Sequence, residues 1–172
     1  MARSIDGDAD AFGALYERHL DAIFRYVYYR VGDTREAEDL TEQVFLRAWE
    51  AIPRYRQRST PFTSWLYRIA HNAVVDFHRD RKWTVPVPSH ELFEIRGERP
   101  SSVQQVIAAE EAARLASAIG QLPEEQQQVV VLRFVEGLGH AEVARVLGKS
   151  PGACRVIQHR ALAALGRLLG EM

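Results

Sequence analysis

The sequence GLGHAEVARVLGKSPGACRVIQHRALAALGRLL, at residues 137–169, predicts two helices that are joined by a tight turn. The first helix is expected to end at Leu147, because Gly148 lacks the Cβ atom that makes a left-handed C-terminal conformation costly. The second is expected to begin at Pro151, which needs no amide hydrogen there, after Ser150, whose hydroxyl can cap the free amides. This arrangement is that of a helix-turn-helix.

The second helix of this pair has an apolar stripe and an outward face. The stripe consists of Ala153, Ile157, Ala161, Ala164 and Leu165. The outward positions are Arg155, Gln158, His159 and Arg160. These side chains lie near the N-terminal half of the helix, which is the half that enters the major groove in DNA-reading proteins. The alternative is an ordinary helical hairpin with a solvated basic face, since such patterns have many false positives.

Composition restricts the class of protein. The chain has 172 residues, of which 47% are hydrophobic, so it can bury a core as one domain or as two small ones. No apolar run approaches the ~20 residues that cross a bilayer and no signal segment is present, so we expect a cytoplasmic protein without membrane insertion. The single cysteine, Cys154, excludes an internal disulfide and is expected to pack, and we expect no metal or other cofactor.

The charges separate along the chain, although the net charge is only -1. Residues 1–50 carry 6 basic and 11 acidic side chains, whereas residues 51–82 carry 7 basic and 2 acidic ones. Residues 149–172 are basic again, with 4 and 1. Attraction to phosphate is local and is screened over roughly 8 Å at physiological salt. The two basic blocks therefore favour DNA binding despite the net charge.

The first basic block belongs to a predicted unit of three amphipathic helices. A stripe of helical period covers residues 12–31 and ends at Gly32. A second stripe covers residues 33–52 and is stopped by Pro53, and a third covers residues 61–77. Three such helices can enclose one core.

Residues 83–102 break the helical period with three prolines, one glycine and a pair of serines. This composition predicts a flexible linker, which can span up to ~65 Å when extended. Helices resume at about Val103 and form a C-terminal unit of about four helices that includes the helix-turn-helix. We therefore predict an all-α fold with two small domains, at residues 8–82 and 103–170, joined by this linker.

Aromatic, basic and amide side chains alternate in the third helix and in the loop before it. They are Tyr55, Arg56, Arg58, Trp65, Arg68, His71, Asn72, His78, Arg79, Arg81, Lys82 and Trp83. Stacking planes, phosphate partners and amide groups together are what unstacked single-stranded bases require. The alternative is that the arginines are solvated and Trp65 is part of the core, and for Trp65 alone core packing is favoured. His71 and His78 lie one heptad apart but lack a third ligand, so we predict no metal site.

Four segments carry a family resemblance. They are EDLTEQVFLRAW (38–49), PFTSWLYRIAHNAVVDFHR (61–79), LPEEQQQVVVLRFVEGLGHAEVARVLG (122–148) and SPGACRVIQHRAL (150–162). In this order they resemble the signatures of a bacterial RNA polymerase sigma factor of the extracytoplasmic-function (ECF) subfamily of the sigma-70 family. The resemblance covers about residues 9–169, and Ile157 departs from it, because that position is usually basic in the family.

The resemblance implies a protein that binds core RNA polymerase, recognises the minus-35 and minus-10 promoter elements and promotes promoter melting and transcription initiation. Residues 8–82 would be sigma region 2 and residues 103–170 would be sigma region 4. The implied partners are the clamp helices of the largest polymerase subunit, the polymerase flap, promoter DNA and an anti-sigma factor. We expect the free chain to be monomeric.

The resemblance also implies three sets of site residues. Contacts with core polymerase would come from Asp39, Glu42, Gln43 and Arg47. Contacts with the minus-10 element would come from Tyr55, Arg56, Arg58, Trp65, Arg68, Asn72, His78 and Arg79. Contacts with the minus-35 element would come from Lys149, Arg155, Val156, His159 and Arg160.

Two other classes of protein remain open. An autonomous helix-turn-helix regulator, acting without polymerase, would explain the C-terminal unit but not the acidic second helix or the side chains of the third. A helical enzyme acting on nucleic acid would need a catalytic constellation of side chains. Asp76 and Asp80 are more simply surface partners for Arg79 and Lys82, so we expect no enzymatic activity.

Overall fold

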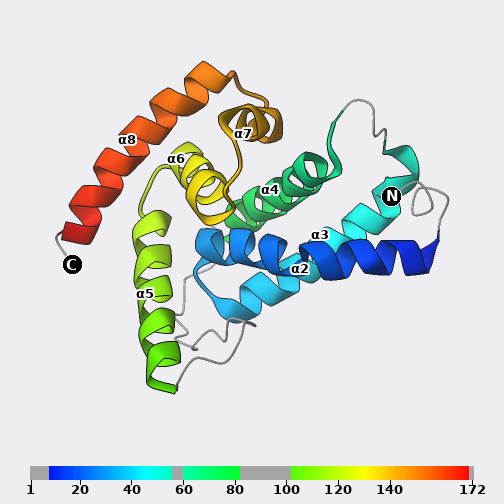
Figure 1. The fold of residues 1–172 in the computed structure, drawn as a ribbon, viewed down its shortest axis with the longest axis horizontal. Helices are drawn as coiled ribbons and strands as arrows, with labels where there is room; N and C mark the ends of the chain where they lie inside the picture. The colour runs from blue at the N-terminus through cyan, green and yellow to red at the C-terminus, as the bar shows by residue number, and fades with distance from the viewer. Residues whose placement is uncertain (1–7, 56–59, 82–101, 171–172) are drawn as a thin grey trace.

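The computed structural model describes residues 8–55, 60–81 and 102–170, which form seven α-helices and no strand (Figure 1). The helices of the N-terminal unit are α2 (Ala9–Val31), α3 (Thr34–Ala51) and α4 (Phe62–Arg81), with the 3-10 turn η1 (Ile52–Arg54) after α3. Those of the C-terminal unit are α5 (Ser102–Gly120), α6 (Glu124–Val130), α7 (His140–Leu147) and α8 (Pro151–Gly170), with the π-helical turn η2 (Val131–Val135) after α6. The predicted all-α fold with a three-helix and a four-helix unit is confirmed. The predicted linker lies outside the described residues, apart from Ser102.

The helices begin and end where the capping chemistry of the sequence places them. The carboxylate of Asp8 accepts a hydrogen bond from the amide of Ala11 at 3.0 Å and so caps α2. Gly32 ends α2 in the left-handed region, with φ at 74°. One residue later the carboxylate of Asp33 accepts from the amide of Glu36 at 2.9 Å, which starts α3. A left-handed glycine next to an N-cap aspartate therefore reverses the chain between the first two helices.

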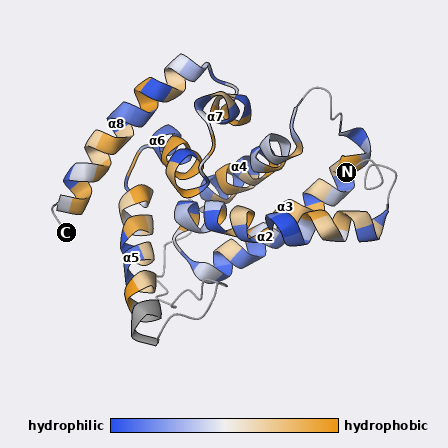
Figure 2. Ribbon diagram, in the orientation of Figure 1, coloured by the Kyte–Doolittle hydropathy of each residue, from blue (hydrophilic) through white to orange (hydrophobic). Residues whose placement is uncertain are grey.

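Apolar and polar residues alternate around the helices, as amphipathic helices require (Figure 2). The predicted stripe of α3 is buried, with Val44 and Ala48 completely inaccessible and Leu40 5% exposed. These residues belong to a buried cluster that continues through α2 and α4 into the C-terminal unit, where Val131 and Leu132 are also inaccessible. The two units thus share one core.

The C-terminal unit packs directly on the N-terminal one. Helix α5 crosses α2 near one of its ends, the turn η2 contacts α2, and α7 contacts α4 (Figure 1). Helix α8 packs on α5, α6 and α7, at the side of the molecule away from α3. The sequence predicts both units, but the relative placement depends on contacts between residues far apart in the chain. Among the helices described here, none is both long enough and apolar enough to cross a bilayer.

Candidate nucleic-acid interface

Helices α7 and α8 adopt the predicted helix-turn-helix connection. Gly148 has φ of 64°, and the amide of Lys149 donates back to the carbonyl of Ala144 at 2.9 Å, which closes the end of α7. The hydroxyl of Ser150 then accepts a hydrogen bond from the amide of Ala153 at 3.1 Å and caps α8. Both predicted capping roles are confirmed.

The inner face of α8 is fixed by packing and by a polar contact. Cys154 and Ala161 are completely buried, so Cys154 packs in the core as expected, and this burial raises the pKa of its thiol. The side-chain carbonyl of Gln158 accepts from Arg133 Nε at 3.3 Å and from His140 Nε2 at 2.9 Å. Gln158 therefore orients α8 against η2 and the start of α7, and is only partly outward.

The outer face of α8 presents four of the predicted minus-35 residues to solvent. Arg155, Val156, His159 and Arg160 are all exposed, and their spacing of one, three and one residues places them on one side of the helix. The fifth, Lys149, lies in the turn before α8, and its Nζ is 2.6 Å from the carboxylate of Glu125. This ion pair joins Lys149 to α6, whereas the four residues on α8 have their side chains exposed to solvent.

Helix α4 has an exposed face with basic and amide side chains. Arg68, Asn72 and Arg79 are exposed and lie four and seven positions apart, on one side of the helix. Arg79 pairs with Asp76 at 3.0 Å and with Asp80 at 3.6 Å. Both carboxylates therefore partner Arg79, as the sequence predicts, and the pairs can exchange for phosphate at little cost because they are exposed.

The aromatic residues around this face are mainly structural. Trp65 is half-buried, and its ring centroid lies 4.9 Å from that of Tyr55 and 5.5 Å from that of Phe62. Tyr55 is only 4% exposed and donates its hydroxyl hydrogen to the carbonyl of Thr60 at 2.6 Å. In this conformation Tyr55 offers no ring face to a base, whereas Trp65 packs against the core and keeps part of its surface exposed. Arg56 and Arg58 lie outside the described residues.

The two histidines of α4 lie on a different side of the helix. His78 donates from Nε2 to the carbonyl of Arg30 at 3.0 Å, so its ring contacts the end of α2. His71 is partly buried, and burial together with the nearby Arg30 charge lowers its pKa. The structure therefore separates His78 from Arg68 and Asn72. Within the described ranges no cluster of three His, Cys, Asp or Glu side chains has the geometry of a metal site.

Helix α3 has the acidic outer face that the sequence predicts. The four side chains singled out on it are all exposed: Asp39, Glu42, Gln43 and Arg47. Arg47 also reaches Asp76 on α4, with Nη1 3.4 Å from the carboxylate. Between them stands Leu46, whose surface is 59% exposed. Leu46 lies outside the buried stripe of α3, and a single exposed leucine is common on protein surfaces, so its exposure alone assigns it no partner.

Comparison with known proteins identifies the class of protein that carries these three surfaces. Residues 15–84 match the family model Sigma-70 region 2, and residues 112–165 match Sigma-70, region 4. The first surface, on α3, and the second, on α4, fall within region 2, and α8 falls mostly within region 4. The chain is therefore a sigma-70 type protein with both regions in order.

Individual relatives identify the subfamily to which the chain belongs. The chain is 40% identical over 171 residues to the ECF RNA polymerase sigma factor BldN of Streptomyces coelicolor, covering 99% of this chain and 65% of BldN. It is 34% identical over 166 residues to the ECF RNA polymerase sigma factor SigD of Mycobacterium tuberculosis, covering 94% of this chain and 78% of SigD. The chain belongs to the ECF RNA polymerase sigma factors.

Solved structures support the fold. CnrH, in a complex with the cytosolic domain of CnrY, has a TM-score of 0.77 and 29% identity, over 99% of this chain and 94% of CnrH. The sigma factor RpoE from Bartonella quintana, in a complex with the anti-sigma factor NepR, has a TM-score of 0.74 and 18% identity. That match covers 94% of this chain and 98% of RpoE, and at this identity it supports the fold alone.

Proposed function

We propose that this chain acts with core RNA polymerase in the cytoplasm, recognises the minus-35 and minus-10 promoter elements, and promotes promoter melting and transcription initiation. The observation that carries the proposal is the combination of three exposed surfaces in one chain: the acidic face of α3, the Arg68–Asn72–Arg79 face of α4, and the outer strip of α8. An autonomous helix-turn-helix regulator needs only the last of these. No catalytic step is assigned to the chain itself.

Transcription in vitro tests this proposal. Core polymerase is incubated on genomic DNA with and without the chain, and the 5' ends of the transcripts are mapped. We expect a small set of start sites that require the chain and share upstream elements at fixed spacing. Specific DNA binding by the chain alone, together with transcription that does not depend on it, would instead favour the autonomous regulator.

Docking on polymerase is assigned to α3. Its exposed acidic side chains would meet the clamp helices of the largest subunit, and Leu46 would supply an apolar contact at the centre of the polar face. Arg47 is held near this face by Asp76. Region 4 would contact the polymerase flap.

Melting is assigned to α4 and the loop before it. Opening the duplex is unfavourable by about 1.4 kcal/mol per base-pair step, so contacts with the backbone and with unstacked bases must offset this cost. The exposed Arg68, Asn72 and Arg79 are placed to make such contacts. We assign Tyr55 a supporting role, because it packs beneath Trp65, and Arg56 and Arg58 remain predictions from the resemblance.

Reading of the minus-35 element is assigned to α8. Replacing Arg155 or Arg160 on this helix is expected to change promoter recognition in two different ways. Arg155 lies nearer the N-terminus of α8 and is assigned to a base edge, and Arg160 to phosphate. Arg155→Ala should cost ~1 to 3 kcal/mol and relax preference at one base pair. Arg160→Ala should weaken all promoters alike and reduce the salt slope by about one.

Transcription from a panel of single-base minus-35 variants measures this difference. Arg167→Ala is the matched control, because Arg167 is also exposed on α8 but lies two turns beyond Arg160. It should leave the order of promoter strengths unchanged. A uniform loss across the panel for Arg155→Ala would make Arg155 an anchor rather than a base reader.

We also extend to this chain the kind of partner that CnrH has. CnrH was solved with the cytosolic domain of CnrY, and we propose that this chain also binds a second protein, an anti-sigma factor that inhibits it. Without that partner the chain is expected to be monomeric.

A further inference from the structure

The turn between α7 and α8 carries a lysine whose side chain is paired with a carboxylate of α6. The backbone of Lys149 is fixed, because its amide donates to the carbonyl of Ala144 at 2.9 Å. Its Nζ lies 2.6 Å from the carboxylate of Glu125, in the first turn of α6. The side chain of Glu125 is 61% exposed and that of Lys149 is 29% exposed. The pair is therefore open to solvent, and another anion can displace the carboxylate without any change in the backbone.

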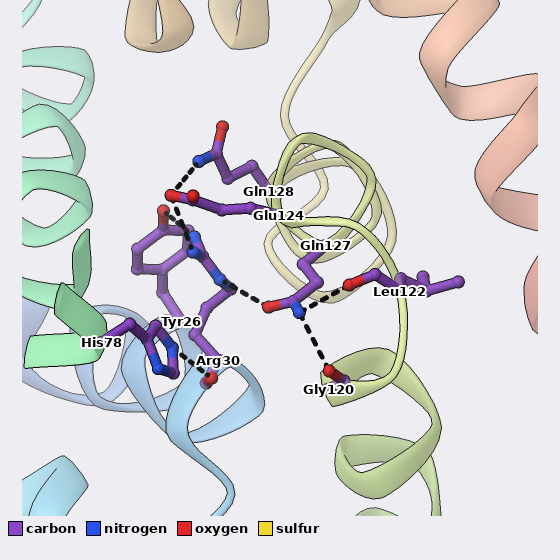
Figure 3. A network of polar contacts seen from close by, with 8 residues as sticks. All are labelled: Tyr26, Arg30, His78, Gly120, Leu122, Glu124, Gln127 and Gln128. Carbon is purple, nitrogen blue, oxygen red and sulfur yellow. Dashed lines mark hydrogen bonds and ion pairs between the residues drawn. The ribbon is translucent and has the colours of Figure 1, made fainter. Parts of the chain in front are cut away.

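The neighbouring carboxylate, that of Glu124, has different partners (Figure 3). It accepts a hydrogen bond from Gln128 Nε2 at 3.2 Å, and the same oxygen lies 3.8 Å from Nη2 of Arg30. Two acidic residues thus begin α6, and Glu125 is the one whose carboxylate contacts the helix-turn-helix.

Lys149 differs in this respect from the other two cations among the proposed minus-35 contacts. Arg155 and Arg160 are exposed on α8, and within the described ranges neither takes part in an ion pair. A cation that contacts DNA phosphate releases condensed counterions, which strengthens binding most at low salt. A cation that must first leave a carboxylate gains less, because the carboxylate attracts it in the unbound chain. Glu125 therefore reduces the contribution that Lys149 can make to DNA binding.

We propose that Glu125 competes with DNA phosphate for Lys149 and thereby sets how tightly region 4 holds the DNA backbone. The inference rests on the proposed function, in which Lys149 lies at the minus-35 element. Phosphate contacts carry no sequence information, so this competition weakens binding to all sequences alike. Glu125 is thus a determinant of affinity, whereas Arg155 is assigned to the choice of base.

The test compares Glu125→Gln with Glu111→Gln in the full chain. Both substitutions remove one negative charge from an exposed side chain of the C-terminal unit, but Glu111 lies on α5 and outside the ion pair. Fluorescence anisotropy of a labelled duplex of random sequence measures the affinity of the free chain for DNA. Transcription by the chain preassembled with core polymerase gives the half-saturating concentration of promoter. Both measurements are repeated over a series of salt concentrations.

For Glu125→Gln we expect about threefold tighter binding at ~50 mM salt and little gain at ~200 mM. The reason is that one additional phosphate contact steepens the salt slope by about 0.9. The order of promoter strengths on the minus-35 panel should not change. Glu111→Gln should match the wild type within about 1.5-fold, because salt screens a distant charge. Circular dichroism should find the same helix content in both variants, since both side chains are exposed.

A double-mutant cycle tests whether the effect depends on Lys149. In a Lys149→Gln background the ammonium group is absent, so Glu125→Gln should tighten binding by less than about 1.5-fold at ~50 mM salt.

Three results would overturn the proposal. Unchanged affinity and salt slope in Glu125→Gln would show that the carboxylate does not compete with DNA. An equal gain with and without the Lys149 ammonium would assign the effect to direct repulsion between Glu125 and phosphate. A changed order of promoter strengths would mean that Glu125 influences the choice of base. A wild-type chain that directs no transcription would remove the proposed function, whereas the anisotropy measurement would still decide whether Glu125 competes with phosphate.

Discussion

Replacing Tyr26 with alanine is expected to lower the free energy of unfolding by about 5 kcal/mol. Tyr26 is completely buried, its ring meets that of Tyr67 edge-on at a centroid distance of 5.5 Å, and its hydroxyl accepts from the buried guanidinium of Arg30. Truncating a buried aromatic costs ~3 to 5 kcal/mol, and loss of a hydrogen bond to a charged group adds ~1.5 to 3 kcal/mol. Such a loss approaches the whole stability of a small domain. Urea unfolding followed by circular dichroism measures it.

Tyr26→Phe separates the two contributions. This variant keeps the ring and removes only the acceptor of Arg30, so we expect a loss of about 1 to 3 kcal/mol. If the alanine variant lost less than about 2 kcal/mol, the ring would not be part of a close-packed core.

Reversing both charges in Asp39→Arg with Glu42→Arg is expected to weaken binding to core polymerase by at least 30-fold, about 2 kcal/mol. Both side chains are exposed on α3, so the helix content and unfolding midpoint should stay close to wild type. We expect the introduced arginines to be repelled by the polymerase surface that attracts the native carboxylates. Equilibrium titration of labelled chain with core polymerase, at two salt concentrations, measures the change.

The matched control is Glu17→Arg with Asp21→Arg. These acidic residues are also exposed, lie one turn apart on α2, and give the same change in net charge. Core affinity should change by less than about threefold. Equal losses in the two double variants would assign the effect to net charge, and unchanged affinity in the α3 variant would remove α3 from the docking surface.

The sequence predicted the helices well, because their ends depend on neighbouring residues. Asp33 and Ser150 cap the helices they precede, and Gly148 adopts the positive φ that ends α7. The segment from Pro123 to Gly137 is different, since its period predicts one continuous helix. The structure instead has a π-helical turn of five residues after α6. This turn differs from an α-helical one by a single extra residue, and the spacing of apolar residues does not show so small a difference.

Surface placement could also be predicted for much of the candidate site. The α3 face and the α8 strip are exposed as the stripes predict, whereas their binding roles stay predictions. Other residues acquire partners that no local pattern specifies. Lys149 pairs with Glu125, 24 positions away, and His78 bonds to the carbonyl of Arg30, 48 positions away. Arg25 and Glu136, whose side chains bond to each other, could not be paired from the sequence for the same reason, since they are 111 positions apart.

The π-helical turn η2 holds one more residue than an α-helical turn would. The amide of Glu136 bonds to the carbonyl of Val131, five residues back, where an α-helix would bond four residues back. Within this turn Arg133 points to Gln158 on the reading helix, and just after it Glu136 points to region 2. Removing the extra residue would leave an ordinary α-helical turn, in which each amide bonds to the carbonyl four residues back. The extra residue in η2 therefore sets the spacing between Arg133, which contacts α8, and Glu136, which contacts α2 and α4.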